Sequence, residues 1–330
     1  MKFGIIGYGR MGKLYEEVLN EIGVKVEFIC DLRKEIEDKK YFKNYKDAFD
    51  LSEVDGVIIS TYGPSHHEII KYAIKKNIKF LICEKPFTTS IKHADEIIYL
   101  LENSRTKLTV SYLRRFSKTY NNLIKKLYNE KIIGEVKTFI VTSGAGGIST
   151  LGTHYIDLST YIISEKIKSV FAIPINKNHP NPRGKEFEDP GGYFVLNFEN
   201  DKRAFFDMSD DLGLQPKIEI IGTYGRIEIS EINKKIIGYC RKNEDKNKPM
   251  RFYGLENRVV LDEEFNFEPL NELIKKLIEN ILSNESIKIT PDIAREKVEI
   301  YSGIRKSFDL HENILFPILG DYYEREFMVT

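Results

Sequence analysis

Lys85 is the side chain whose place in the sequence most directly suggests chemistry. It lies in the segment CEKPF, immediately after an apolar run at residues 78–83 that is typical of a buried strand. In open α/β sheets, ligands bind beyond the carboxyl ends of the strands. A lysine there can donate a hydrogen bond to a substrate hydroxyl and stabilise the charge on its oxygen as a proton leaves. An ordinary surface lysine is the alternative, so the surrounding elements must decide.

A glycine-rich turn near the N-terminus indicates a second chemistry, the binding of phosphate. Gly7, Gly9 and Gly12 follow the G-x-G-x-x-G spacing between an apolar run and a helix-like segment. The first glycine permits a tight turn, the second lets backbone approach a pyrophosphate, and the third lets the helix pack on the strand. The N-terminus of the following helix would direct N–H groups at an anion. A purely structural glycine turn is the alternative.

Asp31 ends the next apolar run, about 20 residues after the glycine turn. An acidic side chain at that place accepts hydrogen bonds from ribose hydroxyls and repels a 2′-phosphate, so the sequence favours NAD over NADP. Arg33 keeps NADP as the alternative, because a guanidinium group can accommodate the phosphate. Strand, loop, helix and acidic residue occur in the expected order, which favours a cofactor loop over a structural turn.

The elements that would position these side chains alternate over the first 115 residues or so. Strand-like runs occur at 2–7, 24–30, 54–60, 78–83 and 107–112, and helix-like segments at 11–23, 66–77 and 91–104. Continuous apolar strands separated by helices indicate a parallel sheet covered on both faces. The sequence therefore predicts a doubly wound α/β domain with the glycine turn after its first strand.

The pattern changes from about residue 135. Strand candidates with little helix between them occur at 134–145, 167–176, 191–200, 202–211, 217–225, 226–232 and 234–242. Turn signals such as NHPNPRG and DPGG separate some of these runs. We expect a largely antiparallel second sheet, a helix at 152–164 facing the first domain, and helices at 268–283 and 291–308 packing back on the body.

Composition excludes several classes of protein. The chain has 330 residues, and its 50 Lys+Arg balance its 50 Asp+Glu, which argues against a nucleic-acid or membrane-surface partner. No run approaches the roughly 18 apolar residues of a membrane span, and no secretory signal is visible. Cys30, Cys83 and Cys240 are widely separated, without disulfide or zinc spacing, so we expect a cytoplasmic protein without a metal site.

Taken together, the motifs resemble a known family. The glycine loop, Asp31, STYGPSHHE, CEKPF, RRF and GTHYID occur in an order similar to that of the glucose–fructose oxidoreductase and inositol dehydrogenase (Gfo/Idh/MocA) family, and the similarity extends to about residue 310. The resemblance implies a Rossmann domain at residues 1–118. It also implies an α+β substrate-binding and oligomerisation domain at 119–330, with a large, mostly antiparallel, open-faced sheet.

The resemblance also implies roles for individual residues. Lys85 would contact substrate and nicotinamide, His154 would act as the general base, and Asp157, one helical turn later, would orient it or cap local structure. An imidazole suits this role because its unperturbed pKa is about 6.5. Besides Lys85, the implied cofactor contacts are Gly7, Tyr8, Gly9, Arg10, Met11, Gly12, Asp31, Leu32, Arg33, Ser60, Thr61, Tyr62, His66, Glu84, Pro86 and Arg115.

Thr150 departs from the family pattern. Many members carry an aspartate four residues before the histidine, whereas this chain has a threonine, whose hydroxyl can hydrogen-bond but holds no charge at neutral pH. Either Lys85 and His154 suffice, or the substrate is arranged differently, or this member is not a dehydrogenase.

We therefore expect an NAD(H)-dependent oxidoreductase acting on a secondary alcohol or ketone of a sugar or nucleotide-sugar-like molecule, assembled as a homodimer or homotetramer. Two alternatives remain at this point. One is a hydrolase or lyase that uses NAD transiently, and the other is a cofactor-binding regulator without catalysis.

Overall fold

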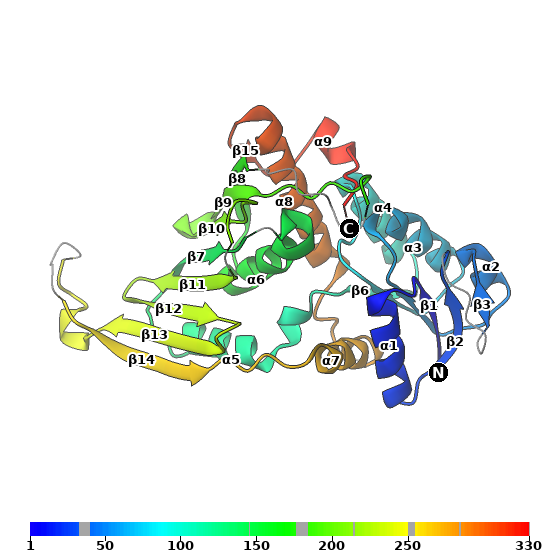
Figure 1. The fold of residues 1–330 in the computed structure, drawn as a ribbon, viewed down its shortest axis with the longest axis horizontal. Helices are drawn as coiled ribbons and strands as arrows, with labels where there is room; N and C mark the ends of the chain where they lie inside the picture. The colour runs from blue at the N-terminus through cyan, green and yellow to red at the C-terminus, as the bar shows by residue number, and fades with distance from the viewer. Residues whose placement is uncertain are drawn as a thin grey trace.

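Six parallel strands form the sheet that carries the glycine turn, in the order β3-β2-β1-β4-β5-β6 (Figure 1). The computed structural model describes residues 1–32, 40–144, 146–175, 184–213, 215–249, 255–283 and 285–329. The strands are β1 (Lys2–Ile6), β2 (Lys25–Cys30), β3 (Tyr41–Phe42), β4 (Gly56–Ile59), β5 (Phe80–Cys83) and β6 (Lys107–Val110). Every residue of β4 and β5 is buried, as expected for parallel strands covered on both faces.

Helices connect these strands and cover the sheet. They are α1 (Arg10–Glu21), α2 (Tyr45–Asp50), the short η1 (Gly63–Ser65), α3 (His66–Lys75) and α4 (Ile91–Glu102). Ser90 caps α4 by accepting a hydrogen bond from the His93 N–H, which satisfies one of the unpaired donors of the first turn. Because β2 and β4 flank β1 on opposite sides, the turns after β1 and β4 meet at the switch point where such sheets bind dinucleotides.

The second sheet contains nine strands in the order β14-β13-β12-β11-β7-β10-β9-β8-β15. Of its strand pairs in the described part of the chain, β7–β10 is parallel and the others are antiparallel, so the expectation of a mostly antiparallel sheet is confirmed. Its strands are β7 (Val136–Thr142), β8 (Ile167–Pro174), β9 (Gly192–Phe198), β10 (Arg203–Asp207), β11 (Lys217–Gly222), β12 (Gly225–Ser230), β13 (Lys235–Arg241), β14 (Asn257–Glu264) and β15 (Ile314–Leu315).

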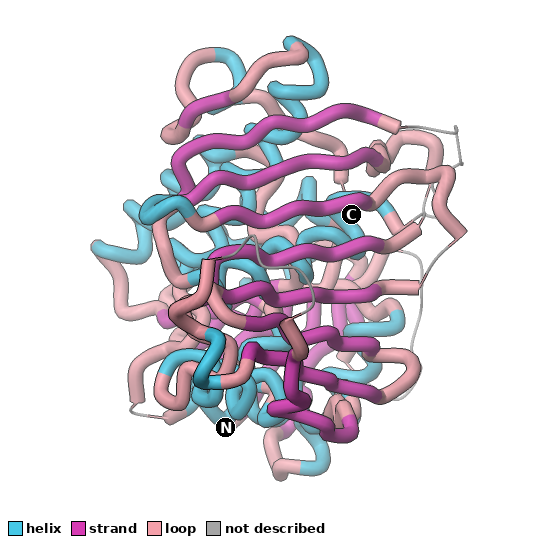
Figure 2. Tube along the Cα trace, turned by 90° about the vertical axis from the view of Figure 1, so that its left-hand side faces the viewer, coloured by secondary structure: helices cyan, strands magenta, loops and turns pink. Residues whose placement is uncertain are grey.

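Helices lie behind one face of this sheet, and Figure 2 looks onto the opposite face. The remaining elements are η2 (Leu113–Phe116), α5 (Lys118–Tyr128), the π-helical turn η3 (Gly147–Gly152), α6 (Thr153–Ile163), η4 (Glu199–Asp201), η5 (Asn243–Asp245), α7 (Leu270–Leu282), α8 (Pro291–Leu310) and α9 (Asp321–Glu324). Alternate residues of β10 are exposed and buried, which is the pattern of a strand with one covered face.

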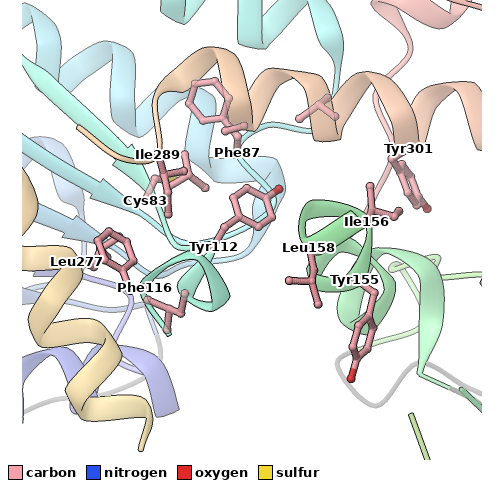
Figure 3. Close-up of a cluster of buried hydrophobic side chains, with 14 of the residues drawn as sticks. Cys83, Phe87, Tyr112, Phe116, Tyr155, Ile156, Leu158, Leu277, Ile289 and Tyr301 are labelled. Atoms are coloured by element: carbon pink, nitrogen blue, oxygen red, sulfur yellow. The ribbon is translucent and has the colours of Figure 1, made fainter. Parts of the chain in front are cut away.

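The two late helices α7 and α8 return to the first sheet. α7 contacts α1, β5 and β6, while α8 lies against α4, β6 and β8 and so touches both sheets. Figure 3 shows the apolar core at this junction, where Cys83 of β5, and Phe87 and Tyr112 from the segments after β5 and β6, lie near Ile289. All four side chains are buried. This shared core fixes the end of β5, and with it Lys85, relative to the second sheet.

Several elements were not anticipated from the sequence. Apart from the short β3, β15, α2 and α9, these are α5 and the strand β14. β14 has one buried residue in eight, because it lies at the edge of its sheet, and its sequence therefore lacks the apolar alternation of a half-buried strand. No helix in the described part of the chain has the length and apolar character needed to cross a membrane.

Candidate active site

The glycine turn after β1 has the geometry of a phosphate loop. Gly7 adopts a positive φ of +89°, and its N–H donates to the Cys30 carbonyl over 2.8 Å. A Cβ at Gly12 would overlap the Gly7 carbonyl oxygen, so the approach of helix to strand requires glycine there. Among the residues that the structure describes, none has an atom within 4 Å of a Cβ at Gly9, and none caps the start of α1 with its side chain. The turn therefore leaves both the space and the free N–H donors that a pyrophosphate needs.

Ser60 joins this turn to the end of β4. Its hydroxyl donates to the Gly7 carbonyl over 2.7 Å, and its N–H donates to the Ile6 carbonyl over 2.8 Å. Of the other predicted contacts near the turn, Arg10 is exposed at the start of α1 and Met11 is half-buried behind it.

Asp31 lies beside the glycine turn, as a ribose-binding carboxylate should. The Tyr8 N–H donates to Asp31 Oδ2 over 2.7 Å, and the Tyr8 hydroxyl reaches Glu16 on α1. Leu32 is 83% exposed, which places its side chain away from the core. Arg33, predicted as a cofactor contact, lies outside the described residues.

His66 ties together the loops that follow β4 and β5. Its Nδ1 lies 2.7 Å from the Pro86 carbonyl oxygen and its Nε2 lies 3.1 Å from that of Thr61. Burial lowers the pKa of His66, while the hydrogen bonds of its ring to backbone carbonyl groups act in the opposite direction. The Lys85–Pro86 peptide bond is cis, and the ring of Tyr62 packs against Phe187 of the second half of the chain.

Glu84 is buried at the end of β5, directly before Lys85. Its Oε1 accepts a hydrogen bond from the Tyr15 hydroxyl over 2.9 Å, and that hydroxyl also lies 3.1 Å from Ser111 Oγ. Burial raises the pKa of Glu84, while the nearby Lys85 charge opposes this shift. Glu84 thereby links α1, β5 and the end of β6 under the predicted nicotinamide end of the site.

Lys85 reaches from the first sheet to the second half of the chain. Its Nζ donates to the Thr150 carbonyl oxygen over 3.0 Å. Thr150 lies in η3, a π-helical turn of a kind that often marks functional sites. The structure therefore brings together Lys85 and Thr150, which lie 65 residues apart in sequence.

His154 follows on the first turn of α6 and is half-buried. Burial, followed by the positive charges of Lys85 and Arg114, lowers its pKa well below the usual value of 6.5. The ring is therefore neutral at pH 7, which is the form that can accept a proton. Lys85, Thr150 and His154 form one group at the junction of the two sheets.

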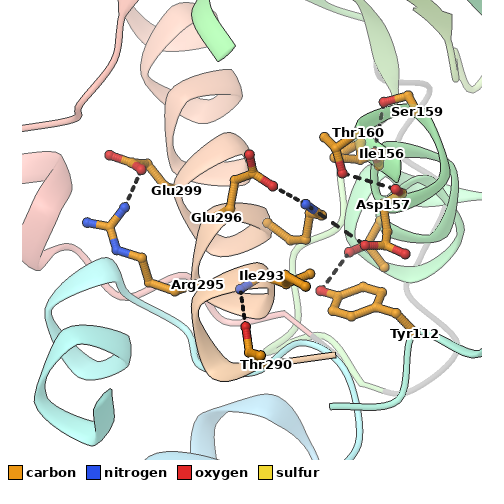
Figure 4. A network of polar contacts seen from close by, with 12 residues as sticks. Tyr112, Ile156, Asp157, Ser159, Thr160, Thr290, Ile293, Arg295, Glu296 and Glu299 are labelled. Atoms are coloured by element: carbon orange, nitrogen blue, oxygen red, sulfur yellow. Dashed lines mark hydrogen bonds and ion pairs between the residues drawn. The ribbon is translucent and has the colours of Figure 1, made fainter. Parts of the chain in front are cut away.

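Asp157 and Arg115 lie in a different environment from the one their predicted roles suggest. They form a buried ion pair in which Arg115 Nε lies 3.0 Å from both Asp157 oxygens. Lys297 of α8 lies 3.9 Å from Asp157 and also pairs with Glu296. Figure 4 shows Asp157 and Glu296 on the facing sides of α6 and α8. Among the described residues no hydrogen bond joins Asp157 to His154, so these contacts favour a structural role, in which Asp157 fixes α6 against η2 and α8.

Two charged groups near the site were missed in the sequence. Asp189 binds the backbone of η3, and Arg114 pairs with Glu231 over 3.1 Å while its charge faces His154. The sequence predicts only a turn for DPGG at 189–192. Asp189 was the available signal there, but its partners Ser149 and Thr150 lie 40 and 39 residues away in the chain.

Comparison with known proteins identifies the family. A model described as "Oxidoreductase family, NAD-binding Rossmann fold" matches residues 1–112, and one described as "GFO/IDH/MocA C-terminal domain" matches residues 134–228. Myo-inositol 2-dehydrogenase of Thermotoga maritima is 25% identical over 348 residues, which cover 97% of this chain and 100% of that protein. Inositol 2-dehydrogenase of Rhizobium meliloti is 23% identical over 256 residues, covering 69% of this chain and 74% of that protein.

Solved structures share the fold. An oxidoreductase from Agrobacterium radiobacter in complex with NAD+, L-tartaric acid and magnesium has a TM-score of 0.76 at 17% identity and covers 96% of this chain and 98% of its own. Scyllo-inositol dehydrogenase from Lactobacillus casei, with bound NAD(H) and scyllo-inositol, has a TM-score of 0.72 at 19% identity, with the same coverage. The chain belongs to the Gfo/Idh/MocA family and is an NAD-binding oxidoreductase acting on CH–OH groups.

Proposed function

We propose that this oxidoreductase acts on a secondary alcohol, or the corresponding ketone, of a sugar-like polyol, with a cyclic polyol of the inositol type as the first candidate. The observation that carries the proposal is the contact between Lys85 Nζ and the Thr150 carbonyl, because Thr150 lies in the turn that leads into α6, whose first turn bears His154. The names of the curated relatives support the polyol class.

The side chains suit the removal of a hydroxyl proton. Neutral His154 would accept the proton, because its lowered pKa keeps the ring unprotonated at pH 7. Lys85 would donate a hydrogen bond to the same oxygen and stabilise its developing negative charge. Bound NAD supplies the acceptor for the hydride that leaves the adjacent carbon. In the reverse direction His154 would return the proton to the oxygen.

The cofactor end would be held by the residues of the first sheet. The N–H groups at the start of α1 would bind the pyrophosphate, and the Asp31 carboxylate would accept hydrogen bonds from the adenosine ribose. Glu84 and His66 would hold the Lys85–Pro86 segment in place beneath the nicotinamide. The carboxylate at position 31 favours NAD over NADP.

A direct assay tests this function. Purified protein is incubated with NAD and, separately, with myo-inositol, scyllo-inositol, glucose and a nucleotide-linked sugar, and NADH is followed by its absorbance. NADH formation with a polyol is the expected result. Substrate conversion without net NADH, or bound cofactor with no turnover of any compound, would contradict the proposal.

We further propose that the uncovered face of the second sheet forms a homodimer interface. Phe171, Val195 and Phe205 are paired across β8, β9 and β10, and Phe171 and Phe205 are 36% and 43% exposed. Such a row of apolar side chains on an open sheet is typical of an interface. Light scattering should show a dimer or tetramer for the wild-type protein and a smaller species for Phe205→Glu. A wild-type monomer at micromolar concentration would refute this interface.

A further inference from the structure

A carboxylate from outside the predicted site binds the turn that carries Thr150. The Ser149 N–H donates to Asp189 Oδ1 over 2.6 Å, and the Thr150 N–H donates to Asp189 Oδ2 over 2.8 Å. The preceding N–H, of Ile148, donates to the Pro190 carbonyl over 3.3 Å. Three successive amides of η3 are therefore held by Asp189 and Pro190, in the segment that leads into β9.

The backbone of the turn is shaped for this carboxylate. Gly147 has a φ of +67°, and a Cβ on it would overlap Oδ2 of Asp189. Position 147 therefore requires glycine for two reasons: its positive φ, and the close approach of the Asp189 carboxylate. Both oxygens accept N–H bonds, which is the pattern expected of an ionised carboxylate.

Thr150 connects this carboxylate to the proposed catalytic lysine. Its N–H points to Asp189 and its carbonyl oxygen accepts the hydrogen bond from Lys85 Nζ over 3.0 Å. Burial raises the pKa of Asp189, whereas hydrogen bonds from Thr150 and Ser149 and the positive charge of Lys85 act in the opposite direction. Because Coulomb attraction is mutual, the Asp189 carboxylate also favours the ammonium form of Lys85.

We propose that Asp189 is a positioning residue of the active site, whose carboxylate holds the 147–150 turn and, through Thr150, fixes the ammonium group of Lys85. The effect of Asp189 on turnover rests on the proposed function, whereas its effect on the position of Lys85 does not. Thr150 carries no charge, whereas Asp189 brings a negative charge to the η3 side of Lys85. The carboxylate reaches the site from the second sheet rather than from α6.

The test reads Lys85 directly and needs no substrate. The full-length protein is treated with trace acetic anhydride at pH 8, and acetylation of Lys85 is compared with that of the exposed Lys118 by peptide mass spectrometry. Asp189→Asn keeps the size of the side chain but replaces one acceptor oxygen by an NH₂ group. That group donates and cannot accept a hydrogen bond, so it would face the N–H of Ser149 or Thr150 without bonding to it. Lys85 should then be acetylated about tenfold faster, which corresponds to about 1.4 kcal/mol. The reason is that a smaller fraction of Lys85 is in the ammonium form and that the Thr150 carbonyl, which accepts its hydrogen bond, is displaced.

Three further variants complete the test. Glu188→Gln is the matched control, because Glu188 is the residue next to Asp189, and its exposed carboxylate pairs with Arg305 and not with η3. In this variant Lys85 should be acetylated at the wild-type rate. Gly147→Ala should raise reactivity as Asp189→Asn does. Thr150→Asp combined with Asp189→Asn should lower it again, because a carboxylate is restored beside Lys85.

Kinetics separate this inference from the proposed function. With a polyol that the wild type oxidises, Asp189→Asn should lower kcat up to about 100-fold while the dissociation constant for NADH stays unchanged. Faster labelling in a protein that oxidises no polyol would support the positioning role and refute the function. Labelling within twofold of wild type would refute the positioning role, and so would loss of the folded state in both Asp189→Asn and Gly147→Ala.

Discussion

The ammonium group of Lys85 donates a hydrogen bond to the Thr150 carbonyl oxygen over 3.0 Å and so joins the end of β5 to the turn before α6. Lys85 follows a strand of the first sheet and Thr150 lies in η3, between β7 of the second sheet and α6; the apolar core between α7, α8 and the first sheet holds the two segments together. The proposed chemistry depends on this contact, because Lys85 and His154 can act on one oxygen only if the sheets keep this arrangement.

Replacing Lys85 tests the proposed charge stabilisation. Lys85→Ala should lower kcat about 10²–10³-fold, the usual effect of removing one donor to a developing oxyanion. The dissociation constant for NADH, measured by fluorescence titration, should change less than threefold. Lys79→Ala, at an exposed lysine just before β5, is the control. Wild-type turnover by Lys85→Ala would rule out the assigned role.

The pH dependence of polyol oxidation should reflect the lowered pKa of His154. A general base works when unprotonated, so kcat/KM should rise with pH and reach its plateau below pH 6.5, because burial and two facing cations lower this pKa. The profile is measured by initial rates of NADH formation between pH 4.5 and 8. His154→Asn should reduce the plateau about 10²–10⁴-fold. An acid limb unchanged in His154→Asn would assign the titration to another group.

The glycine turn allows binding and stability to be separated. Gly9→Ala places a methyl group in open space at a φ of −79°, so stability should change by less than about 0.5 kcal/mol, while NADH affinity falls at least about tenfold. Gly12→Ala meets the Gly7 carbonyl and should destabilise the fold by about 1–3 kcal/mol. Urea denaturation and NADH titration measure the two effects. Tight NADH binding by Gly9→Ala would exclude the turn as the pyrophosphate site.

Asp31 should determine the choice between the two cofactors. Asp31→Ser removes the negative charge that repels a 2′-phosphate, and it also removes one hydrogen-bond acceptor for the ribose hydroxyls. The preference for NADH over NADPH should therefore fall at least about tenfold. Dissociation constants for both cofactors measure this ratio. Asp47→Ser, at an exposed acidic residue in α2, is the control and should leave the ratio unchanged. Equal effects of the two variants would argue against a local role of Asp31.

The Tyr15–Glu84 hydrogen bond should contribute to stability. Tyr15→Phe leaves the buried Glu84 without this donor and should cost about 1–3 kcal/mol of unfolding free energy at pH 7. Burial raises the pKa of Glu84, so its proton is lost at higher pH in the folded than in the unfolded protein. The cost should therefore shrink as pH falls and the carboxyl becomes protonated. Urea denaturation at pH 7 and pH 5 measures it, with Tyr99→Phe, at a side chain 67% exposed, as control. A cost that grew at pH 5 would contradict this account.

The first half of the fold was predictable because its signals are local. The apolar runs that became β1, β4 and β5 are buried on both faces and so are apolar throughout, and the glycine spacing reflects close contacts within a single turn. Cys30 and Cys83, predicted at the ends of buried strands, are buried and free. β14 was missed, since an edge strand leaves a weak periodic pattern. α5 was missed although Tyr120, Leu123 and Leu127 follow a helical spacing along its buried face.

The sequence by itself determined a parallel sheet with a dinucleotide turn, an acidic residue at the ribose position and a lysine at a strand end. Only the tertiary structure decided which partners these groups meet. It placed Asp157 against Arg115 and Lys297, and it brought Asp189 to the backbone of Thr150. The physical reason is that these contacts join residues far apart in the chain. No local pattern records them, because they form only when the two sheets and the late helices bury a common core.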